Sequence, residues 1–203
     1  MMPNQSPWEK EPDLPALRRA YDMITRNEVA AVSKLVDLAN QGSLMSLVYL
    51  GNLYRRGQGS ISPDPGEAER WFRKAADEGS LVGAFHLAIM YMNQERFVES
   101  ESLLKEASAR EYSPAIYWLG RLYWKGPNVM RNITEARLLL ERAADKEHIW
   151  ASRDLARGYL GGDFGFNPLR SARFFLRGAI KFMQVYQSDP KSQRLLRDGA
   201  WTE

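Results

Sequence analysis

Apolar and polar residues follow one another along this chain with the period of α-helices. From about residue 44 onward, apolar side chains recur at offsets of three, four, seven and eight residues, which places them on one face of a helix. Stretches rich in glycine, proline, asparagine and aspartate interrupt the pattern, for example "GQGSISPDPGEA" and "GPNVMRNITEA". The pattern therefore predicts an all-α protein built from short helices.

The helical pattern also repeats along the chain. A leucine followed by a small residue occurs four times, at steps of 37, 32 and 36 residues, and a tyrosine always follows three residues after the small one. The four copies are Leu50-Gly51 with Tyr54, Leu87-Ala88 with Tyr91, Leu119-Gly120 with Tyr123, and Leu155-Ala156 with Tyr159. A glycine comes three residues after the tyrosine in three copies, at Gly57, Gly126 and Gly162. This position suits the left-handed cap that ends many helices.

A second block repeats after each tyrosine: a small residue, two others, two bulky apolar residues, two others and a small pair. It comprises Ala68, Trp71-Phe72 and Ala75-Ala76; Ser100, Leu103-Leu104 and Ala107-Ser108; Ala136, Leu139-Leu140 and Ala143-Ala144; and Ala172, Phe175-Leu176 and Ala179-Ile180. Each copy thus predicts two helices, with small residues where neighbouring backbones approach closely. In the fourth copy, this alignment assigns Phe175, Leu176 and Ala179 to the core.

Helix pairs of this kind bury their apolar faces only by stacking on neighbouring pairs. We therefore predict an α-solenoid forming one domain over residues 13–203, preceded by a disordered tail at 1–12. Its predicted parts are a degenerate helix pair at 13–42, four repeats at about 43–79, 80–111, 112–147 and 148–187, and a capping helix at 188–203.

These residues resemble the Sel1-like repeat, a relative of the tetratricopeptide repeat. The family pattern runs A-x3-L-G-x2-Y-x2-G and then D-x2-K-A-x2-W-(Y/F)-x2-A-A-x2-G, and "LGNLYRRGQG" and "EAERWFRKAADEG" in the first copy follow it most closely. The resemblance covers about residues 30 to 187. It implies a right-handed superhelix of helix pairs that acts as an adaptor between proteins, often in bacterial signalling, envelope assembly or secretion. The paired cysteines of one subfamily are missing here.

The candidates for catalysis or metal binding are few. The chain has no cysteine and two histidines, His86 and His148, which lie in different repeats without carboxylates at ligand spacing. The triplet Asp163-Phe164-Gly165 lacks the other kinase signatures and is interpreted as a loop. We therefore predict no catalytic residue, no cofactor, no metal site and no small-molecule substrate: the protein is not an enzyme.

The N-terminal residues "MMPNQSPWEKEPD" contain no apolar stretch of a secretory leader, and no segment is long and apolar enough for a membrane span. The prediction is a protein located in the cytoplasm, and the resemblance to the Sel1-like repeat implies a bacterial one.

The binding surface is expected on the concave side, lined by the first helix of each pair, as the likeness to tetratricopeptide repeats implies. The predicted partner-binding residues are Asn52, Arg55, Phe85, Met92, Tyr117, Arg121, Trp124, Arg153 and Arg157. Arginine can donate two parallel hydrogen bonds to one carboxylate, and aromatic rings bury a large area on binding at little cost in side-chain entropy. The pattern therefore favours an acidic protein or peptide as the partner.

Two other functions stay open. The net charge is +3, but residues 170–203 carry seven lysines and arginines against three acidic residues. The stretch "RFFLRGAIKFMQVYQ" could thus bind an anionic membrane surface, which would make the protein a peripheral membrane-associated regulator. Its repeat-assigned core residues argue against this alternative. Nucleic-acid binding is less favoured, because the candidate inner positions are not basic in every repeat.

Overall fold

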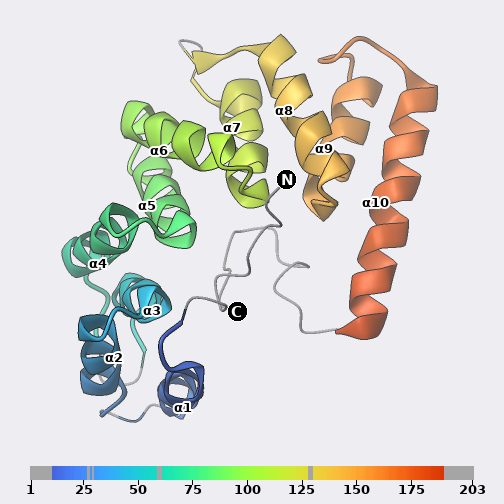
Figure 1. The fold of residues 1–203 in the computed structure, drawn as a ribbon. Helices are drawn as coiled ribbons and strands as arrows, with labels where there is room; N and C mark the ends of the chain where they lie inside the picture. The colour runs from blue at the N-terminus through green and yellow to red at the C-terminus, as the bar shows by residue number, and fades with distance from the viewer. Residues whose placement is uncertain (1–10, 27, 29, 59–60, 128–129, 190–203) are drawn as a thin grey trace. The chain divides into compact units, whose positions relative to one another are not determined.

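The described part of the chain consists of α-helices joined by short loops. A computed structural model describes residues 11–26, 28, 30–58, 61–127 and 130–189. Within these ranges there are ten α-helices and no β-strand beyond one isolated bridge between Gln58 and Ile61. The helices, drawn in Figure 1 from blue to red, are α1 (Leu14–Thr25), α2 (Ala30–Asn40), α3 (Leu44–Arg56), α4 (Pro65–Asp77), α5 (Leu81–Asn93), α6 (Phe97–Ala109), α7 (Ser113–Lys125), α8 (Ile133–Asp145), α9 (Ile149–Leu160) and α10 (Pro168–Ser188).

The helices form two compact units, Met1–Leu103 and Leu104–Glu203, and α6 crosses the division. In the first unit α1 packs on α2, α2 on α3, α3 on α4 and α4 on α5. In the second unit α7 packs on α8, α8 on α9 and α9 on α10. This stacking of each helix on the next is that of an all-α solenoid, and it confirms the predicted fold class.

Both predicted end segments extend beyond the described residues. Residues 1–10 of the predicted disordered tail and residues 190–203 of the predicted capping helix lie outside them. Glu11, which the prediction placed in the tail, accepts hydrogen bonds from the Met45 N–H (2.8 Å) and from the Ser43 hydroxyl. The segment just before α1 is thereby attached to the start of α3.

Polar side chains cap the starts of the helices, as the loop composition indicated. Each accepts a hydrogen bond of 2.9 to 3.1 Å from the backbone N–H three residues further on, which satisfies one of the N–H groups left unpaired at a helix start. These capping residues are Ser43, Asp64, Ser80, Asn132 and Asn167. The helix boundaries are therefore encoded locally.

The glycines after the repeat tyrosines end the helices in different ways. Gly57 caps α3 with a φ of 68°, in the left-handed region as predicted. Gly126 caps α7 with a φ of −71° and a ψ of −177°, so the left-handed prediction is wrong there. A Cβ at Gly126 would lie 2.3 Å from the Leu122 carbonyl oxygen. Glycine is needed at this second position because the backbone is crowded.

Small residues allow the helices of the first unit to approach closely. An added Cβ on Gly51 in α3 would lie 2.5 Å from the Phe72 ring of α4, and one on Gly83 in α5 would lie 2.4 Å from the Ala75 Cβ. Real Cβ atoms do not come this close, so each glycine is matched to the side chain that faces it. Gly51, which follows a repeat leucine, and Gly83, four residues before one, thus serve helix packing, as predicted for the small residues.

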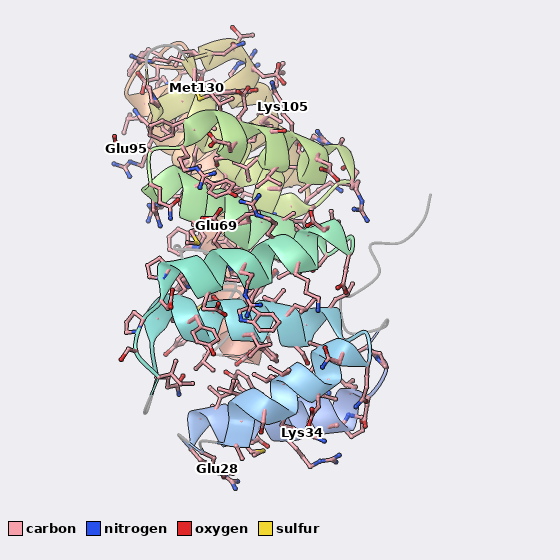
Figure 2. All side chains as sticks on the ribbon, turned by 90° about the vertical axis from the view of Figure 1, so that its left-hand side faces the viewer. Glu28, Lys34, Glu69, Glu95, Lys105 and Met130 are labelled. Carbon is pink, nitrogen blue, oxygen red and sulfur yellow. The ribbon has the colours of Figure 1, made fainter. Side chains whose placement is uncertain are left out.

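Two of the repeat tyrosines attach their helix to a glutamate of the preceding helix. The Tyr91 hydroxyl of α5 donates to Glu69 of α4 at 3.0 Å, and the Tyr159 hydroxyl of α9 donates to Glu141 of α8 at 2.8 Å. An arginine covers each ring, with Arg96 3.8 Å from the Tyr91 centroid. Figure 2 labels Glu69 on α4, on the side of the first unit that faces the viewer. At these two positions tyrosine therefore contributes a hydroxyl that bonds to the preceding helix as well as a ring that packs.

The last helix, α10, contacts α9 through a different face from the one predicted. Ser171, Phe174 and Gly178 face α9: the Ser171 hydroxyl donates to the Ala156 carbonyl oxygen (2.8 Å), the Phe174 ring stacks on Tyr159, and a Cβ on Gly178 would lie 3.1 Å from the Ser152 Cβ. The core assignment of Phe175, Leu176 and Ala179 is wrong, since Phe175 is 64% and Leu176 61% exposed and Ala179 is also exposed. The repeat pattern fits equally well one residue earlier, and a shift of one residue turns a helix by about 100°.

Candidate protein-interaction surface

Asn52 and Arg55 lie on α3 in the first unit and are bonded to each other. The Asn52 amide donates to the Val48 carbonyl oxygen at 3.2 Å and accepts from the Arg55 guanidinium at 3.1 Å. Burial, with a smaller contribution from the neighbouring Arg56, lowers the pKa of the Arg55 guanidinium. Asn52 is buried, so it positions Arg55 and does not itself face a ligand.

Phe85 and Met92 lie on α5, also in the first unit. Phe85 is fully buried, and its ring centroid lies 5.6 Å from that of His86, which in turn stacks on Phe72 at 5.3 Å. Met92 is partly exposed near the end of the helix. The prediction that Phe85 lines an open groove is therefore wrong, and His86 is a core residue.

The first helix of each pair is covered on more sides than the prediction allowed. Every residue from Met45 to Leu53 of α3 is buried. In a stacked array this helix lies between its own partner and the helices before and after it, as the contacts of α3 with α2, α4 and α5 show. Positions between the core residues therefore contact neighbouring helices, which explains the burial of Asn52 and Phe85.

In the second unit, three of the predicted residues gather around one buried carboxylate. Asp154 of α9 is only 3% exposed and accepts a hydrogen bond from the Tyr117 hydroxyl of α7 at 2.9 Å. The Arg121 Nε lies 3.6 Å from one oxygen of Asp154, and the Arg153 Nε lies 3.9 Å from the other. We call Tyr117, Arg121, Arg153 and Asp154 the Asp154 cluster.

The arginines of this cluster each lie over a tryptophan. The Arg121 guanidinium is 4.5 Å from the Trp118 ring centroid, and the Arg153 guanidinium is 4.6 Å from that of Trp150. Both tryptophans are partly exposed. Stacking fixes the guanidinium planes and leaves N–H groups at their edges to meet an acceptor.

Arg157 completes this surface one helical turn beyond Arg153. Its side chain is exposed on α9. Arg121 and Arg153 thus share the carboxylate of Asp154, and Arg157 adds a third guanidinium group one turn further along α9. The surface therefore has an excess of positive charge and attracts carboxylates.

The remaining residues predicted in this unit have structural roles. Tyr117 is fully buried, and its ring stacks on His148 with centroids 4.2 Å apart, so the prediction that it lines a groove is wrong. Trp124 is also buried, and its indole N–H donates to Asp163 at 3.0 Å. We therefore correct the prediction that Trp124 contacts a ligand.

Trp124 attaches the loop between α9 and α10 to α7. Its ring lies 4.9 Å from that of Phe164, and Lys125 donates to the same Asp163 oxygen at 3.2 Å. Burial by itself would raise the pKa of the Asp163 carboxyl, but the hydrogen bonds from Lys125 and Trp124 outweigh it and hold that pKa below its ordinary value. The Asp-Phe-Gly triplet is thus a structural loop, as its sequence context indicated.

Sequence reasoning missed Asp154, Trp118 and Trp150. The position directly before the repeat leucine carries Tyr49, His86, Trp118 and Asp154 in the four copies. Three of these four residues carry rings, so the carboxylate of Asp154 stands at a position otherwise used for packing. A charged group at such a position indicates that it is buried together with polar groups that interact with it. Trp150 has no equivalent signal, since its exposure depends on the packing of α9.

Two searches of the described ranges complete the survey of candidate sites. Among those residues, no group of three or more histidine, cysteine, aspartate or glutamate side chains could hold a metal ion. None of the described helices is both long enough and apolar enough to cross a membrane.

The comparison with family models identifies the repeat itself. The Sel1 repeat model matches residues 44–80 and 113–148, which contain the first and third copies of the pattern. No curated protein matches the chain.

Solved structures share the fold at low sequence identity. A Sel1 repeat protein from Oxalobacter formigenes superposes with a TM-score of 0.68 at 22% identity, over 84% of this chain and 70% of the other. A protective antigen of uropathogenic Escherichia coli with an SLR fold superposes with a TM-score of 0.70 at 18% sequence identity. The match covers 94% of this chain and 44% of the antigen, so this chain spans less than half of the antigen. An immunity protein from Pseudomonas aeruginosa superposes with a TM-score of 0.60 at 17% sequence identity, and the match covers 96% of this chain and 78% of the other.

Proposed function

Because this chain belongs to the Sel1-like repeat family, whose fold commonly serves as a protein-interaction scaffold, we propose that it is a non-enzymatic scaffold binding an acidic segment of a partner protein. The binding surface in the proposal is formed by Trp118, Arg121, Trp150, Arg153 and Arg157 on α7 and α9. We call these five residues the α7–α9 surface. No small-molecule substrate, cofactor or nucleic acid has a part in this proposal.

The observation that carries the proposal is the pairing of stacked arginines with partly exposed tryptophans around a buried carboxylate. The carboxylate oxygens of Asp154 lie 3.6 Å from the Arg121 Nε and 3.9 Å from the Arg153 Nε. The indole rings hold the guanidinium groups from the side, so little side-chain entropy remains to be lost when a ligand binds. A carboxylate can then accept from the free edges while its neighbouring apolar groups cover the indole rings.

Charge favours an acidic partner over a basic or neutral one. The three arginines of this surface outnumber the single carboxylate of Asp154, and an aspartate or glutamate side chain or a chain terminus of the partner would balance the excess positive charge. A nucleic-acid backbone would also balance it, but a reader of nucleic acid needs such residues in repeat after repeat. In the first unit the corresponding positions are occupied by buried Asn52 and Phe85.

The cellular setting is part of the proposal. The solved neighbours come from bacteria, which supports a bacterial protein that could serve a signalling or envelope assembly, and we propose the cytoplasm as its location. The alternative, a peripheral membrane-associated regulator, depends on α10 and concerns a different surface from the α7–α9 surface.

The proposal is tested by capturing partners after crosslinking in the native cell, with the double variant Arg121→Glu plus Arg157→Glu. Trp124 is left unchanged because its burial would make any truncation a folding variant. The matched control is Arg18→Glu plus Arg19→Glu on α1, which makes the same charge change at exposed sites of the first unit.

We expect one protein partner to be recovered with wild type and with the control, and to be lost with the α7–α9 double variant. Circular dichroism checks that all three chains fold equally. Recovery of the same partner by the double variant would refute the proposed site, and loss with both variants would show a general charge effect.

A further inference from the structure

The outer side of α10 exposes a continuous apolar surface. Phe175 is 64% exposed, Leu176 61%, Met183 52% and Ile180 50%. The full set of exposed apolar residues on this helix, which we call the α10 apolar face, is Leu169, Ala172, Phe175, Leu176, Ala179, Ile180, Phe182, Met183 and Tyr186. At about 100° per residue these positions cover about 160° of the helix circumference.

This exposure removes the objection to the membrane alternative. Phe175, Leu176 and Ala179, predicted in the core, point outward because α10 meets α9 through Ser171, Phe174 and Gly178. A contiguous apolar patch of this kind on a protein surface marks an interaction site.

A row of cations borders the α10 apolar face on one side. The helix carries Arg170, Arg173, Arg177 and Lys181 and contains no aspartate or glutamate. Arg177 pairs with Asp145 at 2.9 Å and Lys181 with Glu147 at 2.8 Å, whereas Arg173 makes no ion pair with any described residue. Two of the bordering cations, Arg177 and Lys181, are therefore fixed by ion pairs, and Arg173 can bind a ligand.

A groove of about 430 Å³ lies between this border and the α8–α9 turn. Leu176, Ile180 and Ile149 supply apolar walls. The charged lining consists of Arg173, Arg177 and Lys181 against the one carboxylate of Glu147, so positive charge is in excess. Apolar walls beside guanidinium groups match an amphiphile with an anionic head.

We propose that α10 lies flat on the surface of an anionic phospholipid bilayer. The α10 apolar face enters the boundary between headgroups and acyl chains, and Arg173 contacts lipid phosphates beside the groove. This arrangement is typical of an interfacial amphipathic helix, which combines a basic polar side with aromatic and aliphatic residues on the other. It concerns a surface separate from the α7–α9 surface.

The charge and the width of the face favour a bilayer over a second copy of the chain. A second copy would bring an equally basic α10, whereas anionic lipid carries the opposite charge. A helix that packs on one other helix needs a narrow apolar seam, while a face of about 160° suits a surface that surrounds the exposed side.

The test is flotation of the full 203-residue chain with two kinds of vesicle. One kind is phosphatidylcholine alone, and in the other roughly one lipid in four is phosphatidylglycerol. The test variants are Leu176→Glu plus Met183→Glu, which removes apolar contact at exposed sites, and Arg173→Glu, which reverses the unpaired charge. The matched control is Leu138→Glu on α8, since Leu138 is also exposed, at 48%.

Wild type and the Leu138 control should float with the anionic vesicles and not with phosphatidylcholine alone. Both test variants should lose partitioning by about tenfold or more, because each removes one of the two contributions. Wild type remaining in solution with both kinds of vesicle would overturn the proposal. A chain that fails to float and is a dimer by light scattering, but becomes a monomer on Leu176→Glu plus Met183→Glu, would also overturn it and assign the face to a second copy.

Discussion

The Tyr117–Asp154 hydrogen bond is expected to stabilise the Asp154 cluster measurably. Replacing Asp154 by alanine leaves the fully buried Tyr117 hydroxyl without its acceptor, which costs about 1–3 kcal/mol. The loss of the Arg121 and Arg153 contacts adds little, about 0–1 kcal/mol each, because they are long and partly exposed. The expected loss in free energy of unfolding is therefore about 1–5 kcal/mol for Asp154→Ala.

Replacing Tyr117 by phenylalanine removes the hydroxyl while keeping the ring stacked on His148. It removes one hydrogen bond to a buried carboxylate, so we expect a loss of about 1.5–3 kcal/mol. The double variant should cost about 1–2 kcal/mol less than the sum of the two single changes, since neither partner then remains unsatisfied.

The assay is urea unfolding followed by circular dichroism and by tryptophan fluorescence. Coincident transitions from the two probes would justify a single free energy of unfolding for each variant. Tyr186→Phe is the control, because Tyr186 is half exposed, and its change should stay within about 0.5 kcal/mol. Additive costs, equal to the sum of the single changes within about 0.5 kcal/mol, would refute a coupled hydrogen bond.

Three further predictions concern pH and packing. Burial alone would raise the pKa of the Glu69 carboxyl, but hydrogen bonds from Arg73 and Tyr91 hold it below the ordinary value of 4.5. The ionised carboxylate therefore contributes fully to stability above pH 4.5, and this contribution is lost as the pH falls through the pKa of the folded state. Glu69→Gln should flatten the dependence of stability on acid pH measured by circular dichroism, and an unchanged dependence would contradict the role of Glu69. Trp124→Phe removes a donor to Asp163 and should raise the pKa of that carboxyl in an NMR titration, whereas an unmoved pKa would show that Lys125 suffices. Gly158→Ala places a Cβ 2.2 Å from the Phe164 ring and should destabilise the chain by about 1–3 kcal/mol in urea unfolding, so a neutral result would mean that the loop moves away at no cost.

The apolar skeleton of the fold was predictable because each element carries its own local signals. Helix starts follow from capping residues such as Ser43 and Asp64, and the close approach of α3 to α4 follows from Gly51 facing Phe72. These signals depend only on neighbours along the chain and on the period of the helix. They fixed the helix boundaries and the stacking without any knowledge of the tertiary arrangement.

The orientation of α10 could not be predicted, because two alignments satisfy the same pattern. The small residue can be Ser171 or Ala172 and the small pair can begin at Gly178 or Ala179, and both choices give bulky apolar residues between them. Only the contact with Ala156 of α9 shows that Ser171 faces inward. The alignment error of one residue moved an exposed apolar face into the predicted core.

The candidate site was predictable in its charge and not in its exact membership. Arginines at Arg121, Arg153 and Arg157 were found because the repeat register places them together on one side. Tyr117 and Trp124 were placed on the surface because the register alone does not show which positions the neighbouring helices cover. Burial is a tertiary property, and a single repeat does not contain it.

The central claim, that a protein partner binds the α7–α9 surface, is tested most directly by photocrosslinking in the native cell. A photoreactive phenylalanine analogue replaces Trp118 in one chain, Trp150 in a second, and Val98 on α6, which is 71% exposed, in a third. The account predicts one covalent protein adduct, identical for positions 118 and 150, and none at position 98. An adduct formed only at position 98, or none at positions 118 and 150 while the partner is still captured, would contradict it.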